Sequence, residues 1–285
     1  MKRKEFLLTL IKGAALSPLL AANATAMNNN NLQFIQLWRH ATMTLTMNGR
    51  KILIDPMLSP KDAMDPVQNA GNTLRIPMVE LPFTPDELNS QLSDLDAVFV
   101  THTHRDHWDD AAINMLDKAT PIFCQPPDYE KIQGAGFVDV RKIDKDVEWG
   151  GMKIYRTKGR HGTGEIGQKM GEVSGFVFQI NTTTVYLAGD TIWCPEVEEA
   201  LKKHHPDVVV LNTGGAKFLT GGPITMTPAD VKETLRHTGE ALVVAVHMDT
   251  INHCVVKRND LRESLKTTGD AGKVFIPADG EQVAF

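Results

Sequence analysis

The sequence contains few cysteines, no basic cluster in its body and few aromatic residues. Three cysteines in 285 residues, an odd number, do not form a disulfide framework. The net charge of −5 comes from acidic and basic residues that are mixed along the chain. Lysine and arginine form no run after the first four residues, so nothing predicts a nucleic-acid surface. The hydrophobic content of 42% and the ordinary glycine and proline counts exclude disorder and fibres. We therefore expect one compact, enzyme-sized globular domain over residues 27–285.

The first 26 residues have the composition of an export signal. They begin with three basic residues among the first four, continue with two apolar stretches and end in small residues at 24–26. Lys12 interrupts the apolar sequence well short of the roughly 18 residues that a membrane span requires. We expect a signal peptide over residues 1–26 that is removed, no membrane span, and an exported, periplasmic protein. Arg3-Lys4 resembles a twin-arginine signal with lysine as its second basic residue, and the general secretory route is the alternative.

One short segment carries the strongest chemical signal. His102, His104, Asp106 and His107 place four metal-ligand side chains within six positions, directly after the apolar residues 95–100. Imidazole nitrogens and carboxylate oxygens hold zinc and similar divalent ions. Side chains alternate in direction along an extended strand, so His102 and His104, at the end of this strand, point the same way. Asp106 and His107 follow a turn and can face a second ion. A solvated turn before a helix is the alternative, but it leaves three histidines unexplained.

Short strand-like segments dominate the first half of the chain and alternate with helices in the second half. We expect strands at 32–37, 43–47, 51–54, 95–100, 121–124, 152–156, 175–180, 184–187 and 208–211, and helices at 109–118, 195–203, 227–237 and 259–267. Residues 57–94, rich in Pro, Asp and Asn, predict a long surface excursion near the site. This order of elements favours two sheets with helices packed outside them.

Three isolated residues at predicted strand ends extend the metal-ligand pattern. His161 lies in Gly-Arg-His-Gly, Asp190 in Leu-Ala-Gly-Asp-Thr, and His247 ends Val-Val-Ala-Val-His. Alone, each has an ordinary interpretation, as a surface residue, a helix cap and a core histidine respectively. Together with the first motif, they resemble the metallo-β-lactamase superfamily. Its pattern is His-X-His-X-Asp-His after a strand, then a lone His, then Gly-Asp, then a final His.

The resemblance spans roughly residues 32–280 and implies both a fold and a ligand set. The fold is α/β, an αβ/βα four-layer sandwich of two mixed sheets flanked by helices, with the site at one edge between the sheets. The implied ligands form two metal sites that Asp190 bridges: His102, His104 and His161 hold one ion, and Asp106, His107 and His247 hold the other. The nitrogen-rich set favours two zinc ions, with manganese or iron as alternatives.

Two adjacent divalent ions predict hydrolysis. Since one zinc lowers the pKa of bound water to about 7, a bridging hydroxide is available at neutral pH without a separate base. Open coordination positions polarise a carbonyl or phosphoryl oxygen and stabilise the charge that develops on it. We predict a binuclear metal-dependent hydrolase of a small molecule, with Asp106, Asp190 and His40 as its catalytic residues.

Particular residues select a branch of the superfamily. Asp190 argues against true β-lactamase activity, because the lactam-hydrolysing members carry Cys or Ser there, and His104 argues against flavodiiron oxidoreductases, which carry Glu. The chain is most similar to the branch that contains ascorbate 6-phosphate lactonase and N-acyl phosphatidylethanolamine phospholipase D. It shares with that branch His40, the Ile-Asp55-Pro segment, Gly-Asp190-Thr and the Thr-Met-Thr-Pro segment at 225–228. We expect Asp55 to support the metal loop.

These motifs define the chemistry better than the substrate. Hydrolysis of a carboxylic ester or lactone ranks first, and a phosphodiesterase or phospholipase-like activity ranks second. A phosphorylated substrate would be better supported if Arg39, Lys158 and Arg160 formed a basic cluster facing the metals. A non-catalytic, metal-containing scaffold that binds a small molecule is the third interpretation. Arg39, Arg160 and His253 are the candidate substrate-pocket residues. Cys254 could line the same pocket, but we favour a packing role for it.

Overall fold

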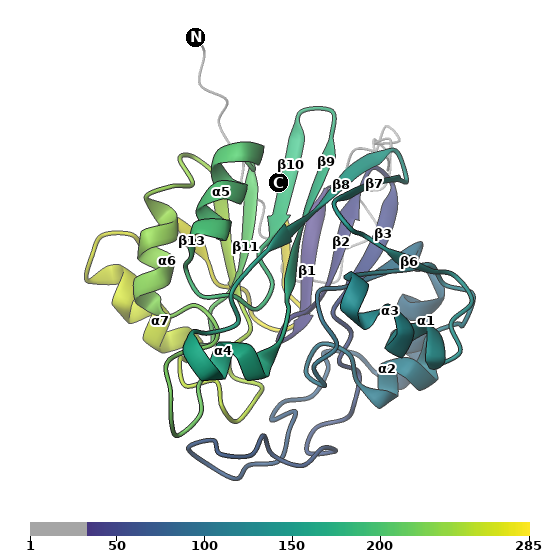
Figure 1. Ribbon diagram of the computed structural model, residues 1–285, viewed down its shortest axis with the longest axis horizontal. Helices are drawn as coiled ribbons and strands as arrows, with labels where there is room; N and C mark the ends of the chain where they lie inside the picture. The colour runs from purple at the N-terminus through teal and green to yellow at the C-terminus, as the bar shows by residue number, and fades with distance from the viewer. Residues whose placement is uncertain (1–32) are drawn as a thin grey trace, which may run out of the picture.

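The computed structural model describes residues 33–285, so the predicted signal peptide lies outside the described residues. Two seven-stranded mixed sheets dominate the fold (Figure 1). The first sheet has the order β14-β1-β2-β3-β4-β5-β6, formed by β1 (Phe34–Arg39), β2 (Thr42–Met47), β3 (Arg50–Ile54), β4 (Ala97–Val100), β5 (Ile122–Cys124), β6 (Val140–Lys142) and β14 (Gln282–Ala284). The second has the order β13-β12-β11-β10-β9-β8-β7, formed by β7 (Asp146–Trp149), β8 (Met152–Lys158), β9 (Ser174–Ile180), β10 (Thr183–Leu187), β11 (Val208–Asn212), β12 (Leu242–Val246) and β13 (Val274–Phe275).

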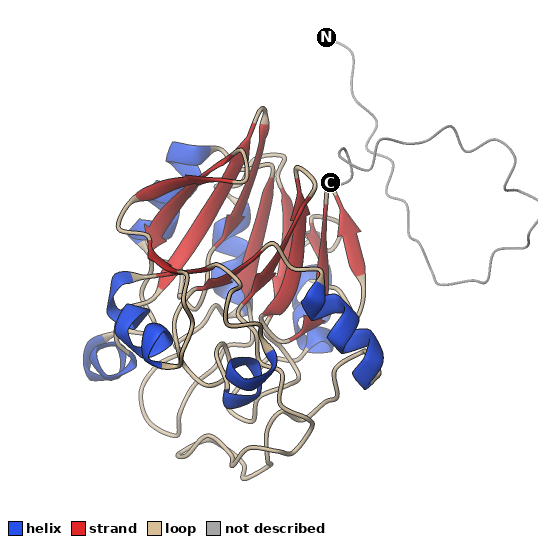
Figure 2. Cartoon of the chain, turned by 90° about the vertical axis from the view of Figure 1, so that its right-hand side faces the viewer, coloured by secondary structure: helices blue, strands red, loops and turns tan. Residues whose placement is uncertain are grey.

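Helices lie on the outer faces of the two sheets and beside the loops at their lower edge (Figure 1 and Figure 2). They are α1 (Pro85–Ser93), α2 (Asp110–Met115), the short 3-10 helix η2 (Pro126–Asp128), α3 (Tyr129–Gly134), α4 (Gly164–Met170), α5 (Pro195–His204), α6 (Pro228–Leu235) and α7 (Arg258–Lys266). One apolar cluster packs α1, α2 and α3 on the first sheet, and another packs α5, α6 and α7 on the second. The predicted αβ/βα sandwich is confirmed. No helix among residues 33–285 has the length and apolar content that crossing a membrane requires.

A third apolar cluster joins the inner faces of the sheets. Phe99 of β4 stacks on Phe123 of the same sheet, with ring centroids 4.5 Å apart. It also meets Phe178 and Phe176 of β9 at centroid distances of 4.9 and 5.5 Å. All four rings are fully buried. Burying an aromatic side chain contributes roughly 1.5–3 kcal/mol, so this layer contributes strongly to holding the sheets together.

Strand direction determines where the polar residues gather. Strands β3 to β6 run parallel to one another, and so do β10 to β13. Strands β1 and β8 share these directions, because each is separated from its parallel set by an antiparallel neighbour. The carboxyl ends of these strands therefore meet at one edge of the sandwich. This is the edge toward the loops in the lower part of Figure 1.

The expectation for residues 57–94 is partly wrong. The last part forms α1, whose first turn has a capping box between Thr84 and Glu87 and a proline at its start. Met57, Leu58 and Ile76 are buried, so much of the segment packs on the molecule and does not simply run over its surface. Of the predicted helices, the one at 109–118 is shorter than expected, because the backbone becomes extended at Leu116.

Arg39 fastens this segment to the first sheet. Its side chain is completely buried, and its guanidinium donates to the carbonyl oxygens of Val79, Met57 and Ser59 at 3.0, 2.8 and 2.9 Å. Burial lowers its pKa to about 10, partly opposed by the carboxylate of Asp109, so it stays charged at neutral pH. Removing this guanidinium would leave buried carbonyl oxygens without a hydrogen-bond donor, which lowers the free energy of unfolding.

We expect Arg39→Met to lower the free energy of unfolding by about 2–3 kcal/mol, as measured by urea denaturation. Arg50→Met is the matched control. Arg50 is half exposed and pairs with Asp96, so its loss should change stability by less than about 1 kcal/mol. Equal effects of the two substitutions would contradict the assignment of Arg39 as a buried clamp.

Candidate metal centre

The predicted ligands converge at the shared edge of the two sheets. All are buried except His104, which is partly exposed. Together with His40, they form three overlapping groups of nitrogen and oxygen atoms, and the atoms in each group lie within 4.8 Å of one another. These groups are His102, His104 and His161; His102, His107 and Asp190; and His40, Asp106, His107 and His247.

The first cluster consists of three imidazoles and one carboxylate. His104 Nδ1 lies 2.9 Å from His102 Nε2 and 3.3 Å from His161 Nε2. Asp190 Oδ2 lies 3.6 Å from His161 Nε2 and 4.0 Å from His102 Nε2. Three nitrogens and one oxygen thus face a common point, which is a donor set that divalent zinc accepts.

The second cluster shares Asp190 with the first. His107 Nε2 and His247 Nε2 are 3.2 Å apart, and each lies 3.2 Å from an oxygen of Asp190. Asp106 Oδ2 is 3.8 Å from both of these nitrogens. The Asp190 carboxylate therefore lies within reach of the ligand nitrogens of both clusters.

Hydrogen bonds on the outer side of the rings fix their orientation. His107 Nδ1 donates to Asp55 at 2.8 Å, and His161 Nδ1 donates to the Ile224 carbonyl at 2.8 Å. His102 Nδ1 lies 3.1 Å from the Thr101 hydroxyl, which itself donates to Asp55. With the proton of each ring on the outer nitrogen, the inner nitrogens present lone pairs to one another. Such an arrangement fits cations between the rings, because lone pairs about 3 Å apart otherwise repel.

The backbone makes tight turns where three strands end at this site. His40, Asp55 and His247 have left-handed φ values of 59°, 45° and 70°. Residues other than glycine adopt this region uncommonly, and such conformations cluster at functional sites. The amide of His247 donates to the carbonyl of His40 at 2.9 Å, which joins the two turns across the sheets.

Burial and neighbouring charges set the protonation of the ligands. Burial raises the pKa of Asp190, but the imidazoles of His247 and His107 outweigh it and hold that pKa well below its usual range. Burial lowers the pKa of both His102 and His161. Burial also acts to lower the pKa of His107, but the carboxylates of Asp190, Asp106 and Asp55 outweigh it and hold that pKa well above its usual range, so metal binding there would release a proton. Ionised carboxylates and neutral imidazoles are the forms that bind divalent ions.

His40 lies beside the second cluster. Its ring is completely buried, its Nε2 lies 3.2 Å from Asp106 Oδ2, and its ring centroid lies 3.6 Å from that of His247. Burial lowers its pKa well below the usual range, and the neighbouring His247 adds to this effect. His40 can therefore orient Asp106 through a hydrogen bond while it is neutral.

The candidate substrate residues are placed differently from one another. The guanidinium of Arg39 is committed to loop carbonyls, Arg160 is exposed and donates to Glu196, and Lys158 is exposed. These residues therefore do not form the basic cluster that would support a phosphorylated substrate. His253 is 6% exposed, and the carboxylates of Asp106 and Asp190 lie within electrostatic range of it. Burial lowers its pKa to about 4.

Two residues near the ligands were not predicted to contact them. The side-chain amide of Asn212 donates to Asp190 Oδ1 at 2.7 Å and is buried. Cys254 Sγ lies 3.6 Å from His247 Nδ1. The sequence offers a signal for Asn212, because it is the polar end of the otherwise apolar strand β11. For Cys254, the signal is its position shortly after His247 in the sequence.

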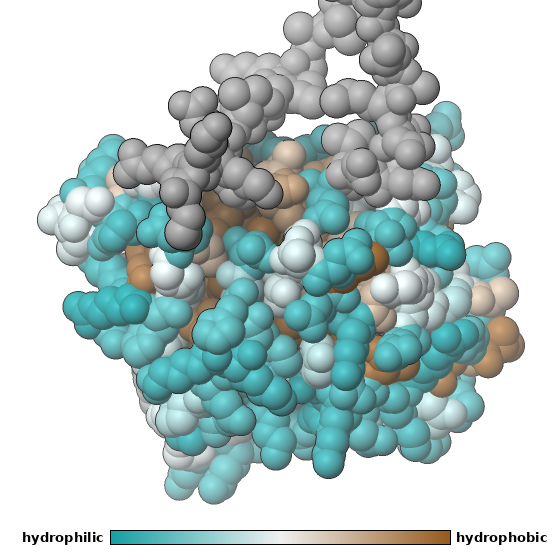
Figure 3. Space-filling view, turned by 90° about the horizontal axis from the view of Figure 1, so that it is seen from above, coloured by the Kyte–Doolittle hydropathy of each residue, from teal (hydrophilic) through white to brown (hydrophobic). Residues whose placement is uncertain are grey.

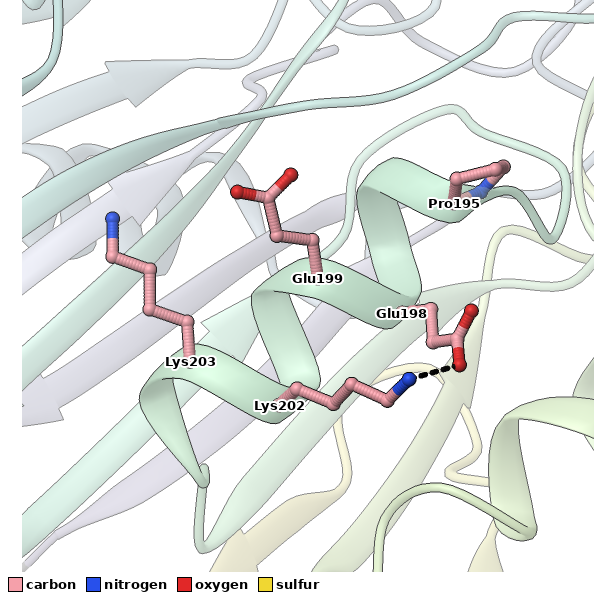
Figure 4. Close-up of a pocket in the computed structure, with 5 residues that line it drawn as sticks. All are labelled: Pro195, Glu198, Glu199, Lys202 and Lys203. Carbon is pink, nitrogen blue, oxygen red and sulfur yellow. Dashed lines mark hydrogen bonds and ion pairs between the residues drawn. The ribbon is translucent and has the colours of Figure 1, made fainter.

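An open depression on the outside of α5 has a different character. It is lined by Pro195, by two acidic residues and by two basic residues one turn further along the helix: Glu198, Glu199, Lys202 and Lys203. Figure 4 shows that Lys202 pairs with Glu198 along the helix. Such solvated pairs are common on helix surfaces. In the view of Figure 3, the visible surface of the described residues is mainly hydrophilic, with smaller apolar areas.

The fold and the ligand clusters define the class of protein. Residues 50–248 match the Beta-lactamase superfamily domain. The chain belongs to the metallo-β-lactamase superfamily and, within it, to the UPF0173 family of metal-dependent hydrolases. It is 35% identical to the UPF0173 protein YddR of Bacillus subtilis over 251 residues, which cover 87% of this chain and 98% of that protein.

Two solved structures are similar over nearly their whole length. One is described as a possible metal-dependent hydrolase from Veillonella parvula, with 39% identity and a TM-score of 0.85. The other is an isothiocyanate hydrolase from Delia radicum gut bacteria, with 39% identity and a TM-score of 0.83. Each comparison covers 89% of this chain and 99% of the other. The superfamily resemblance that the motifs indicated is confirmed.

Proposed function

We propose that this chain is a binuclear metallohydrolase of small molecules. The observation that carries the proposal is the position of Asp190. Its Oδ2 lies 3.2 Å from His107 Nε2 of the second cluster and 3.6 Å from His161 Nε2 of the first, while Oδ1 lies 3.2 Å from His247 Nε2. A carboxylate in this position favours two neighbouring cations over one, since it contributes negative charge to both.

The residues of the chain have distinct roles in this proposal. Two divalent ions, when bound, would lower the pKa of water and polarise the reacting group of the substrate. His102, His104 and His161 would hold one ion, Asp106, His107 and His247 the other, and Asp190 both. His40 orients Asp106, Asn212 orients Asp190, and Asp55 orients His107. Such outer contacts keep the ligands in place before substrate arrives.

A carboxylic ester or lactone is the first substrate class that we propose. Both present a carbon that water attacks and an oxygen that a cation polarises. An isothiocyanate is the second candidate, because the similar isothiocyanate hydrolase is aligned over 89% of this chain at 39% identity. Its central carbon is also an electrophile doubly bonded to heteroatoms. Phosphodiesters are less favoured, since Arg39 and Arg160 are engaged elsewhere.

Metal removal tests the proposal. We expect two equivalents of metal by elemental analysis, loss of nearly all hydrolysis after dialysis against a chelator, and recovery on addition of zinc, manganese or iron. The screen contains lactones, esters, isothiocyanates, amides and phosphodiesters. A single bound equivalent with full activity would exclude the binuclear centre. Tight binding of a compound that the metallated protein never hydrolyses would favour the non-catalytic scaffold.

A further inference from the structure

The three imidazoles of the first cluster come from different sheets. His102 and His104 belong to residues 101–107 after β4 of the first sheet, which we call the ligand loop, whereas His161 follows β8 of the second sheet. Their nitrogens nevertheless converge, since His104 Nδ1 lies 3.3 Å from His161 Nε2. His104 is the partly exposed ligand, and its other ring nitrogen has no hydrogen-bond partner among residues 33–285. The position of this ring therefore depends on how the ligand loop itself is held.

Thr103, between two of the ligands, is held by its side chain and by its backbone. Its hydroxyl donates to Asp128 Oδ1 at 2.6 Å, and its carbonyl accepts from Lys131 Nζ at 2.8 Å. Asp128 ends the short helix η2 and Lys131 lies in α3, so both contacts attach the ligand loop to the segment that follows β5. The loop is thus fixed at the residue that joins His102 to His104.

A chain of hydrogen bonds continues from Asp128 into the second sheet. Its other oxygen, Oδ2, accepts from Gln125 Nε2 at 2.8 Å, and Gln125 Oε1 accepts from the Ser174 hydroxyl at 2.7 Å. Arg156 Nε donates to that hydroxyl at 2.6 Å. Ser174 begins β9, and Arg156 lies on β8, the strand that leads to His161. These hydrogen bonds therefore connect the two segments that supply the first cluster.

Donors and acceptors are matched along this chain of side chains. We call it the polar bridge: Thr103, Asp128, Gln125, Ser174 and Arg156. Gln125 and Ser174 are 1% and 0% exposed. Gln125 Nε2 also donates to the Glu172 carbonyl at 2.8 Å, and the Arg156 guanidinium pairs with the Glu172 carboxylate. A buried network whose members are all paired is costly to disturb and favours a single arrangement.

We propose that Asp128 is a positioning residue for the metal ion of the first cluster. Through Thr103 and the rest of the polar bridge, it holds the ligand loop at the distance from His161 that one divalent ion requires. This inference rests on the proposed function. A ligand set that is shared by two sheets keeps its geometry only while the segments that carry it keep their relative position. Among the described residues, no hydrogen bond of the polar bridge goes to a ligand ring, so Asp128 acts through the backbone of the loop.

Zinc affinity tests this role without turnover. The fully metallated protein is equilibrated with chelator buffers of decreasing free zinc, and the bound equivalents are counted. Thr103→Val removes the hydroxyl and keeps the shape of the side chain, whereas Thr103→Ser keeps the hydroxyl. We expect Thr103→Val to weaken one of the two equivalents about tenfold, the lower end of the range for groups that orient metal ligands, and to leave the other unchanged. Thr103→Ser should stay within about twofold of the unmodified protein.

Two further variants test whether the effect passes along the polar bridge. Ser174→Ala removes the link to the second sheet, and it should weaken the same equivalent about threefold to tenfold. Asp128→Ala removes the acceptor of the Thr103 hydroxyl. In this background, Thr103→Val should have no additional effect on zinc affinity, because two residues that act through one hydrogen bond are not additive.

Thr84→Val is the matched control. The hydroxyl of Thr84 also donates to a carboxylate, that of Glu87 at 2.9 Å, but in the capping box of α1 and outside the ligand groups. Its loss should lower the midpoint of urea unfolding and leave both zinc affinities unchanged.

Unchanged zinc affinity in Thr103→Val or in Ser174→Ala would overturn the inference, and so would an equal weakening of both equivalents. A lower urea midpoint without any change in zinc affinity would show that the polar bridge is purely structural. If the unmodified protein binds a single equivalent, or hydrolyses nothing, the proposed function fails. The affinity of the remaining equivalent then still tests Asp128, because Thr103→Val must weaken it and Thr103→Ser must spare it.

Discussion

Asp190→Ala is expected to lose at least one equivalent of metal and more than about 100-fold of the hydrolytic activity. Losing an outer group that only orients a ligand costs 10–100-fold in metal affinity or activity, and removal of a shared ligand should exceed that range. The variant also removes the charge that offsets two neighbouring cations. Elemental analysis and kcat/KM of the most active substrate from the screen provide the measurement.

The isosteric variant Asp190→Asn controls for packing. It retains the shape of the side chain and an oxygen that can accept from Asn212, which lies 2.7 Å from Asp190 Oδ1. We expect a native circular dichroism spectrum together with nearly the same loss of metal and activity. If Asp190→Ala keeps both metal equivalents and full turnover, the bridging assignment is wrong.

Asp55→Ala is expected to have the largest effect on stability. The carboxylate accepts from the amide and the hydroxyl of Thr101, both at 2.7 Å, and from His107 Nδ1 at 2.8 Å. Removing one partner of a buried charged group typically costs about 3–5 kcal/mol, and here three donors become unpaired. Metal affinity should also fall about 10- to 100-fold, because His107 loses its orientation.

Unfolding in urea at saturating metal and after chelation separates the two effects of Asp55→Ala. If the carboxylate acts mainly through folding, most of the destabilisation persists in the metal-free protein. An Asp96→Ala variant is the comparison, because Asp96 accepts from Arg50 and from the Lys51 amide in a partly exposed setting. If Asp55→Ala lowers the free energy of unfolding no more than Asp96→Ala does, the predicted contribution of Asp55 to stability is wrong.

The ligand set was predictable because its members occupy one recurring position. Each follows the carboxyl end of a strand, so an ordered set of His and Asp residues at strand ends carries three-dimensional information. Asp55 was predicted to support the metal loop, and the structure places it on His107 and Thr101. The surroundings of Arg39 were not predictable, since its partners are backbone carbonyls 18 to 40 residues away. Any residue type supplies a backbone carbonyl.

Several helices and strands were not predicted from the sequence, and the reasons are again physical. Helix α4 contains glycines at 164 and 167 and lacks a side-chain cap at its start, so its local helical preference is weak. Helix α1 had readable signals in Thr84, Pro85 and Glu87, but they lie in a segment otherwise rich in turn residues. Strand β14 depends on pairing with β1 from the opposite end of the described chain. Such pairing leaves no local pattern.

The ligand clusters draw on both sheets, since His102 to His107 follow β4 of the first sheet and His161, Asp190 and His247 follow strands of the second. Bound ions would therefore cross-link two halves that otherwise meet through their apolar layer. Metal at 100 times its dissociation constant adds about 2.7 kcal/mol of stability by mass action alone. A core substitution of that cost would be offset where metal is plentiful and would lower the stability of the chain where metal is scarce. The number of destabilising substitutions that this fold tolerates therefore depends on how much of the metal ion is available.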